Sequence, residues 1–147
     1  MREIVRSDVN EEWAHSGVVE AGDFVFISYC VGNIGQPIEN QINGAFDHLA
    51  RRLESIGLTL ESVVKMDCLF RDAWNIPVME KVIRERFAGK YPARKSIQTD
   101  FAHIGGQEGL HFQLDAGKQQ IGRAGSGGIL FHRHPDENIV ICLNYSL

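Results

Sequence analysis

The chain lacks long apolar runs, an excess of basic residues and a cysteine-rich framework. No stretch approaches the roughly 18 apolar residues that cross a bilayer, and the first residues lack the apolar core of a signal peptide. A formal net charge of −4 argues against general affinity for nucleic acid or anionic membrane. The three cysteines lack metal-site spacing, which suits a reducing compartment. These absences predict a cytoplasmic protein with neither a membrane nor a nucleic-acid partner.

The sequence also lacks a complete metal site. The nearest candidate is the pair His132 and His134, and no carboxylate or thiol stands at a spacing that would complete the metal shell. We therefore expect no bound metal.

The chain has the composition of one globular domain, and this composition changes near the C-terminus. Hydrophobic residues make up 44% of its 147 residues, enough to bury a core. From Gly117 onward glycines become frequent, and short apolar runs at residues 129–131 and 139–143 could form extra strands. We therefore predict a domain at residues 1–116 and a glycine-rich C-terminal tail of unknown role at residues 117–147.

Alternating and helical apolar patterns predict the element order β-β-α-β-α-β-β. Residues 15–20 and 24–30 indicate a hairpin that turns at Gly22 and Asp23 and sets His15 opposite Cys30. Helical stripes cover residues 38–56 and 76–87, and strands are expected at 63–70, 94–102 and 110–116. Such alternation argues for an α+β sandwich with two helices on one face of a sheet.

The same patterns assign side chains to surfaces. Asn75 is expected to cap the second helix, and four of its charged residues are expected in water: Glu80, Lys81, Arg84 and Glu85. Three residues of the strand at 63–70 are assigned to the sheet face without helices: Val64, Met66 and Phe70. Because these side chains are too apolar for water, self-association is the simplest cover for that face.

Arg94 is the first candidate for a functional residue. Pro92 forces extended geometry on the chain, so Arg94 stands at the first position of a strand, beside a turn. A guanidinium there is well placed to bind a carboxylate through two hydrogen bonds at the mouth of a pocket. The alternative is an ordinary surface arginine.

Five stretches carry a resemblance to a known family: Val19–Ser28, Gln41–Leu53, Ser62–Asp67, Pro92–Arg94 and Gln113–Ala116. In this order they resemble the reactive intermediate deaminase family, named Rid or YjgF. The resemblance implies a chorismate-mutase-like α+β fold with a mixed sheet, a homotrimer with clefts between its subunits, and no cofactor or metal. Family members hydrolyse small enamines and imines, such as 2-aminoacrylate, to 2-keto acids and ammonia.

The resemblance also implies roles for particular residues. Arg94 matches the arginine that holds the substrate carboxylate, and Gln113 falls where a glutamate positions the attacking water. An amide can hydrogen-bond water but cannot exchange a proton near neutral pH, which puts efficient deamination in doubt. Backbone groups of Ser28 and Ser96 would help to place the water. The remaining expected substrate-binding positions are His15, where many members have a tyrosine, and Tyr29 and Cys30, where they have glycine and glutamine.

The sequence leaves four functions open. The leading one is a hydrolase acting on small carboxylated imines. The loss of the family glutamate at Gln113 favours the second, a non-catalytic trimer that binds a small acid and modulates a partner. The negative net charge and the lack of a basic, aromatic strip count against the third, a ribonuclease. The fourth is nucleophilic catalysis by Cys30 with His15, although a buried cysteine beside a core histidine is the commoner arrangement.

Overall fold

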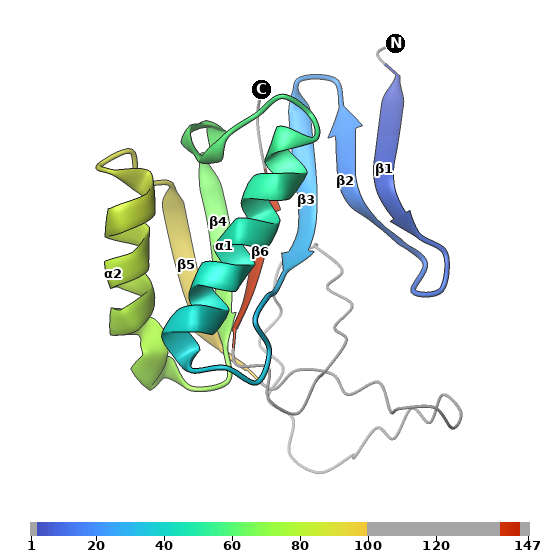
Figure 1. The fold of residues 1–147 in the computed structure, drawn as a ribbon. Coiled ribbons are helices and arrows are strands. Elements are labelled where there is room, and N and C mark those ends of the chain that lie inside the picture. The colour runs from blue at the N-terminus through green and yellow to red at the C-terminus, as the bar shows by residue number, and fades with distance from the viewer. Residues whose placement is uncertain (1–2, 100–138, 145–147) are drawn as a thin grey trace.

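A computed structural model describes residues 3–99 and 139–144 (Figure 1). These residues form one six-stranded sheet with the strand order β1-β2-β3-β6-β4-β5, and α1 and α2 both cover the same face of it. The sheet is mixed, because β4 and β5 are parallel whereas the other neighbouring strands are antiparallel. The predicted α+β class is therefore confirmed.

The N-terminal part of the sheet is an antiparallel meander of β1 (Ile4–Asn10), β2 (His15–Ala21) and β3 (Phe24–Cys30). The predicted hairpin is observed, with the register running from Ala21 opposite Phe24 to Val18 opposite Ile27. Its turn includes Gly22, whose φ of 65° lies in the left-handed region that glycine adopts without strain. Beyond Ile27 the pairing of β3 becomes irregular.

The two helices follow the predicted apolar stripes. In α1 (Ile38–Glu54) the buried side chains include Ile42, Phe46, Leu49 and Leu53, and in α2 (Ile76–Phe87) they are Met79, Val82, Ile83 and Phe87. Asn75 occupies the predicted N-cap position of α2, but its side chain makes no capping hydrogen bond. A short 3₁₀ turn, η2 (Ala73–Asn75), precedes α2 instead, and the carboxylate of Asp72 accepts a hydrogen bond from the backbone N–H of Trp74 at its start.

The centre of the sheet combines strands from distant parts of the chain. The strand β4 (Lys65–Phe70) pairs with β5 (Ala93–Gln98) on one side and with β6 (Ile139–Asn144) on the other. The other edge of β6 pairs with β3. The extra strand predicted at 139–143 therefore exists and lies inside the sheet (Figure 1). The predicted strand at 110–116 and the predicted boundary at residue 116 lie outside the described residues.

The main core lies between the sheet and the helices, and it corrects one prediction. Met66 and Phe70 are fully buried there with residues of α1 and α2, so they do not belong to the sheet face without helices. Val64, just before β4, is 52% exposed. Leu69 is an apolar β4 side chain on the other face, where it packs with Tyr29, Val31 and Ile97.

The face without helices nevertheless carries apolar surface. Val25 and Ile27 of β3 are buried in the main core, so alternation along the strand turns Phe24 and Phe26 to the other face. Their rings lie 6.4 Å apart, and the two residues are 50% and 42% exposed. In the described part of the chain, no helix is long and apolar enough to cross a bilayer.

Candidate functional site

The predicted site residues occupy two separate places in the protomer. His15, Ser28, Tyr29 and Cys30 belong to β2 and β3, whereas Arg94 and Ser96 belong to β5. Since β6 and β4 lie between β3 and β5, the β3 residues stand three strand spacings from Arg94 and Ser96, about 14 Å, and His15 of β2 stands one strand further away. Gln113 lies outside the described residues.

Arg94 and Tyr29 also lie on different faces of the sheet, whereas Cys30 lies on the same side as Arg94. Arg94 and Ser96 stand beside Met66 and Cys68 of the neighbouring parallel strand, which face the helices. Tyr29 packs on the opposite face with Leu69. We name these two groups of candidate residues the β5 half-site (Arg94 and Ser96) and the β3 half-site (His15, Ser28, Tyr29 and Cys30).

In the β5 half-site, the guanidinium of Arg94 is held by three neighbouring side chains. Its Nη1 donates to Ser96 Oγ at 3.0 Å and lies 3.6 Å from Met79 Sδ, while Nη2 donates to Glu80 Oε1 at 3.0 Å. The Arg94 side chain is 26% exposed and that of Glu80 is 41% exposed. Arg94 is therefore partly buried, oriented by polar contacts and still reachable from solvent.

Glu80 is a partner of Arg94 that the sequence analysis missed. It was expected in water because it lies off the apolar stripe of α2, and its carboxylate is indeed partly exposed. What the helical pattern could not show is that α2 lies close enough to β5 for Glu80 and Arg94 to form an ion pair. The only sequence signal for this pair was the opposite charge of Glu80 and Arg94, which lie before and after the connection between α2 and β5.

In the β3 half-site, the rings of His15 and Tyr29 stack, with centroids 5.4 Å apart and planes at 30°. The predicted opposition of His15 and Cys30 is not observed, because β3 loses its regular pairing between Ile27 and Cys30. Tyr29 thus turns to the face without helices, while Cys30 is buried in the main core.

Cys30 sits beside Arg52 of α1, a second residue that the sequence analysis missed. Arg52 Nη1 donates to the backbone oxygens of Tyr29 at 2.6 Å and Ser28 at 3.4 Å, and it lies 3.6 Å from Cys30 Sγ. Its Nε donates to Asp8 Oδ2 of β1 at 2.8 Å. Arg52 therefore holds the irregular end of β3 against both α1 and β1.

The electrostatics of Cys30 argue against a nucleophilic role. Burial raises the pKa of its thiol to about 11, and this effect outweighs the opposite influence of the Arg52 charge. A thiol with such a pKa is almost wholly protonated near neutral pH, and the thiolate is the reactive form. His15 stacks on Tyr29 instead of contacting this thiol.

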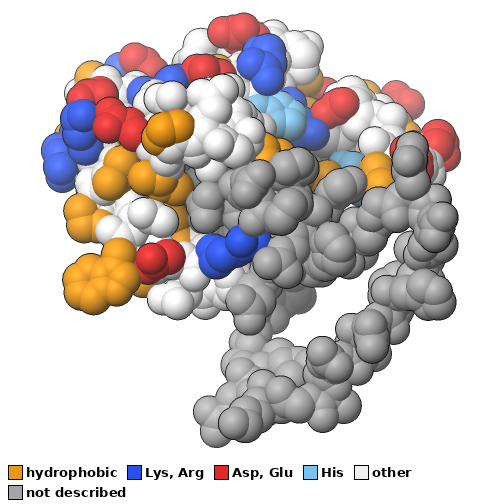
Figure 2. Space-filling model, turned by 60° about the horizontal axis from the view of Figure 1, so that its bottom comes forward, with side chains coloured by type: hydrophobic (Ala, Val, Ile, Leu, Met, Phe, Trp, Pro, Cys, Tyr) orange, Lys and Arg blue, Asp and Glu red, His pale blue; other side chains and the backbone are white. Residues whose placement is uncertain are grey.

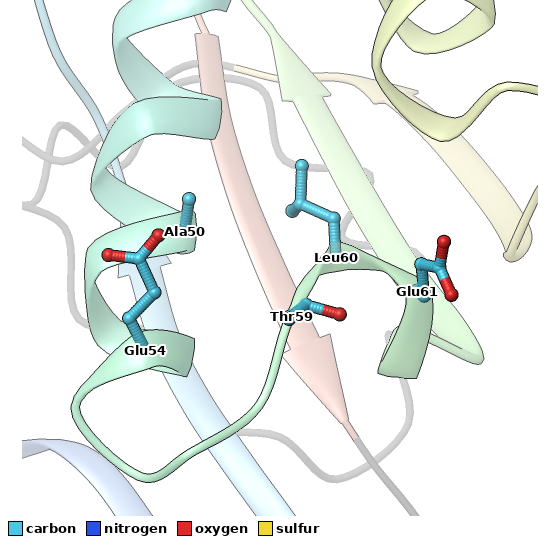
Figure 3. A pocket seen from close by; sticks show the side chains of 5 residues that line it. All are labelled: Ala50, Glu54, Thr59, Leu60 and Glu61. Carbon is cyan, nitrogen blue, oxygen red and sulfur yellow. The ribbon is translucent and has the colours of Figure 1, made fainter.

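A hollow of about 460 Å³ lies elsewhere, between the end of α1 and the 3₁₀ turn η1 (Leu60–Ser62), as Figure 3 shows. No predicted site residue lines it. Its two acidic side chains, Glu54 and Glu61, lie on opposite sides of the hollow (Figure 3), and Glu61 forms an ion pair with Lys90 at 2.7 Å. This arrangement brings no catalytic groups together.

Metal chemistry has no candidate site in residues 3–99 and 139–144, where no group of three histidine, cysteine, aspartate or glutamate side chains could hold an ion. The pair His132 and His134 lies outside these residues.

The fold and the sequence together place the protein in a family. The sequence model of the family described as endoribonuclease L-PSP matches residues 6–109, so the chain belongs to this family, also called YjgF or Rid. A solved structure of a yjgF-family member from Streptococcus pyogenes is 51% identical with a TM-score of 0.75, covering 100% of this chain and 98% of that one.

Two further relatives are more distant. A 2-iminobutanoate/2-iminopropanoate deaminase from Dermatophagoides farinae is 26% identical over 90 residues, which are 56% of this chain and 70% of that protein. A YjgF-family structure from Neisseria meningitidis has a TM-score of 0.70 at 17% identity, covering 98% of this chain and 94% of that one, and shows the shared fold.

Proposed function

We propose that this protein is a hydrolase that deaminates small carboxylated enamines and imines, giving 2-keto acids and ammonia. Membership of the YjgF or Rid family and the similarity to a deaminase of that chemistry support the proposal. The observation that carries it is the state of Arg94, whose guanidinium is oriented by Ser96 and Glu80 yet remains 26% exposed. Such a group suits a ligand carboxylate.

The reaction needs little from the protein besides positioning. Water adds to the imine carbon, its proton moves to nitrogen, and the resulting carbinolamine loses ammonia as the carbonyl forms. In this proposal Arg94 binds the carboxylate, while Gln113 and backbone groups of Ser28 and Ser96 place the water. Because an imine is already electrophilic, holding the water and the carboxylate in register can supply useful rate without a strong base.

A complete site requires more than one protomer. The β5 and β3 half-sites lie about 14 Å apart, and Arg94 and Tyr29 lie on opposite faces of one sheet. A homotrimer with clefts between subunits would let the β5 half-site of one protomer meet the β3 half-site of its neighbour. The exposed Phe24 and Phe26 favour such an association through the face without helices.

Direct turnover tests the proposal. An amino-acid oxidase can generate the imine in place while semicarbazide traps it, so that hydrolysis appears as lost semicarbazone. We expect the parent protein to lower the semicarbazone yield and Arg94→Ala to abolish this effect. Equal yields with and without the parent protein would refute the hydrolase.

The second candidate is a non-catalytic protein that binds a small acid, favoured by the amide at Gln113 in place of a carboxylate. It predicts binding of a keto acid through Arg94 with no imine turnover. The same assay, run beside a titration with 2-oxobutyrate, separates the two candidates.

A further inference from the structure

The strongest unexplained feature is that Arg94 already has a carboxylate partner. Glu80 Oε1 lies 3.0 Å from Nη2, while Nη1 is engaged with Ser96 Oγ at 3.0 Å and faces Met79 Sδ at 3.6 Å. The terminal edge of the guanidinium, which would grip a carboxylate through two hydrogen bonds, is thus occupied by groups of the protein itself. A ligand carboxylate that binds this edge must share it with Glu80 or displace Glu80.

The consequence depends on the charge of the ligand. A plain carboxylate that displaces Glu80 leaves two negative groups close together beside one arginine, and like charges at this range repel. A ligand with a positive nitrogen next to its carboxylate can pair with both Arg94 and Glu80. Its carboxylate can bind Arg94 while its N–H groups donate to Glu80, so that the original pair is replaced by two.

The arginine can stay in place during this exchange. Ser96 lies two residues along the same strand and anchors Nη1, and Met79 is fully buried in the core beneath the guanidinium. Glu80 is 41% exposed at its side chain and can rotate toward solvent or ligand. The mobile member of the pair is therefore the glutamate.

We propose that Glu80 is a specificity-determining residue that makes the Arg94 site prefer zwitterionic ligands, with a positive nitrogen beside the carboxylate, over plain carboxylates. This inference rests on the proposed function, and it concerns which of the substrate and the product binds more tightly. The protonated imine of a 2-amino acid is such a zwitterion, whereas the 2-keto acid product carries only the negative charge. Glu80 would then favour the substrate over the product and assist product release.

The test compares two stable ligands of similar size by isothermal titration calorimetry: 2-aminobutyrate, which is zwitterionic, and 2-oxobutyrate, which is a plain carboxylate. We expect the parent protein to prefer 2-aminobutyrate by at least about fivefold, near the upper end of what a partly exposed ion pair contributes. In Glu80→Gln we expect 2-oxobutyrate to bind at least about fivefold more tightly and 2-aminobutyrate to bind more weakly, which reverses the preference.

A matched control is available on the same helix. Glu85 is exposed in α2, so Glu85→Gln makes the same charge change away from Arg94 and should leave both affinities as in the parent. If Glu80→Gln leaves the ratio of the two affinities unchanged, or weakens both ligands equally, the inference is overturned. An equal shift of the ratio in Glu85→Gln would also overturn it, since the effect would then be one of net charge.

Arg94→Ala distinguishes this inference from the proposed function. If it abolishes binding of both ligands while Glu80→Gln does not change their ratio, Arg94 remains the anion site and only the role of Glu80 is lost. If Arg94→Ala binds both ligands as the parent does, the proposed function fails as well. A parent protein that binds neither ligand overturns both, and circular dichroism of each variant verifies its fold.

Discussion

At the scale of single residues, Arg94 is the residue on which the proposed function depends. We expect Arg94→Ala to weaken 2-oxobutyrate binding by roughly 2–5 kcal/mol, the typical cost of losing one member of a hydrogen-bonded charge pair. Arg94→Lys should recover little, because an ammonium cannot form the planar two-bond contact. Calorimetry on the three proteins measures both effects, and full affinity in the lysine variant would show that charge alone is sufficient.

In the proposed mechanism, Gln113 determines how much acid–base help the chain can give to the attacking water. Replacing it with glutamate changes the shape little and adds a group that can exchange a proton with the bound water. General acid–base help is worth about 10²–10⁴-fold, so Gln113→Glu should hydrolyse 2-aminoacrylate-type imines at least roughly tenfold faster than the parent. The semicarbazide assay measures the rates. Equal rates would mean that Gln113 does not stand where the proposed mechanism needs a base.

At the scale of elements, Arg52 links α1 to the first and third strands. Its side chain is only 10% exposed and donates to Asp8 and to the backbone oxygen of Tyr29. Hydrogen bonds of charged groups contribute about 1.5–3 kcal/mol each, so Arg52→Met should lower the free energy of unfolding by roughly 2–4 kcal/mol. The neighbouring Arg51 is exposed, and Arg51→Met should change the free energy of unfolding by less than about 0.5 kcal/mol. Urea unfolding compares the two, and similar losses would refute the role of Arg52.

His48 of α1 makes the attachment of β3 sensitive to pH. Its Nδ1 lies 3.0 Å from the backbone oxygen of Val31, just after β3. Burial, followed by the charge of Arg52, lowers the pKa of His48 below its usual 6.5. The unfolded chain therefore binds a proton at a higher pH than the folded chain does. Stability should be fully present above pH 6.5 and should fall as the pH drops below that value toward the folded-state pKa.

The measurement is urea unfolding of the parent and of His48→Gln at pH 7.5 and 5.5. The variant cannot titrate at position 48, so its stability should fall less over this interval. The other titratable groups are shared by the two proteins and cancel in the comparison. An equal fall in both would contradict the assignment to His48.

How far the sequence predicts the elements depends on whether the signal is local. The stripes of α1 and α2 and the register from Val18 opposite Ile27 to Ala21 opposite Phe24 follow from periodicity and one turn, and the structure has them. Strand faces and partners depend on distant segments. Met66 and Phe70 were placed on the wrong face because alternation defines two faces of β4 without saying which one the helices cover.

In the candidate site, too, local features could be predicted from the sequence and contacts between distant segments could not. The position of Arg94 in a strand followed from Pro92, and β5 begins one residue before Arg94. Its partner Glu80 and the Arg52 contacts at Ser28 and Tyr29 depend on how helices cross strands, which no spacing along the chain encodes. The location of β6 between β3 and β4 likewise depends on pairing across most of the chain.

At the scale of the whole molecule, the exposed apolar residues bear on where the proposed homotrimer would form its contacts. Figure 2 shows apolar side chains gathered at one margin of the described surface, beside acidic and basic ones. The exposed apolar residues include Trp74 in η2, at 88%, and the stacked pair Phe24 and Phe26 on the sheet face without helices. Phe24 and Phe26 lie on the face that carries the Tyr29 cluster.

This difference makes the proposed homotrimer testable by position as well as by mass. Light scattering of the purified protein at micromolar concentration should give three times the mass of the 147-residue chain. A charge placed in the contact should dissociate it, because an unpaired buried charge is costly. Phe26→Asp should therefore yield monomers, and Trp74→Asp, a more exposed aromatic on η2, should leave the trimer intact.

Activity should follow assembly. If the β5 half-site of one subunit works with the β3 half-site of another, folded Phe26→Asp monomers keep Arg94 and its contacts but lose imine hydrolysis. The semicarbazide assay on size-fractionated protein compares the two species, with circular dichroism to verify the monomer's fold. Monomers that hydrolyse the imine at the parent rate would mean that one protomer holds a complete site. Other residues of the same chain would then have to bridge the 14 Å between its two half-sites.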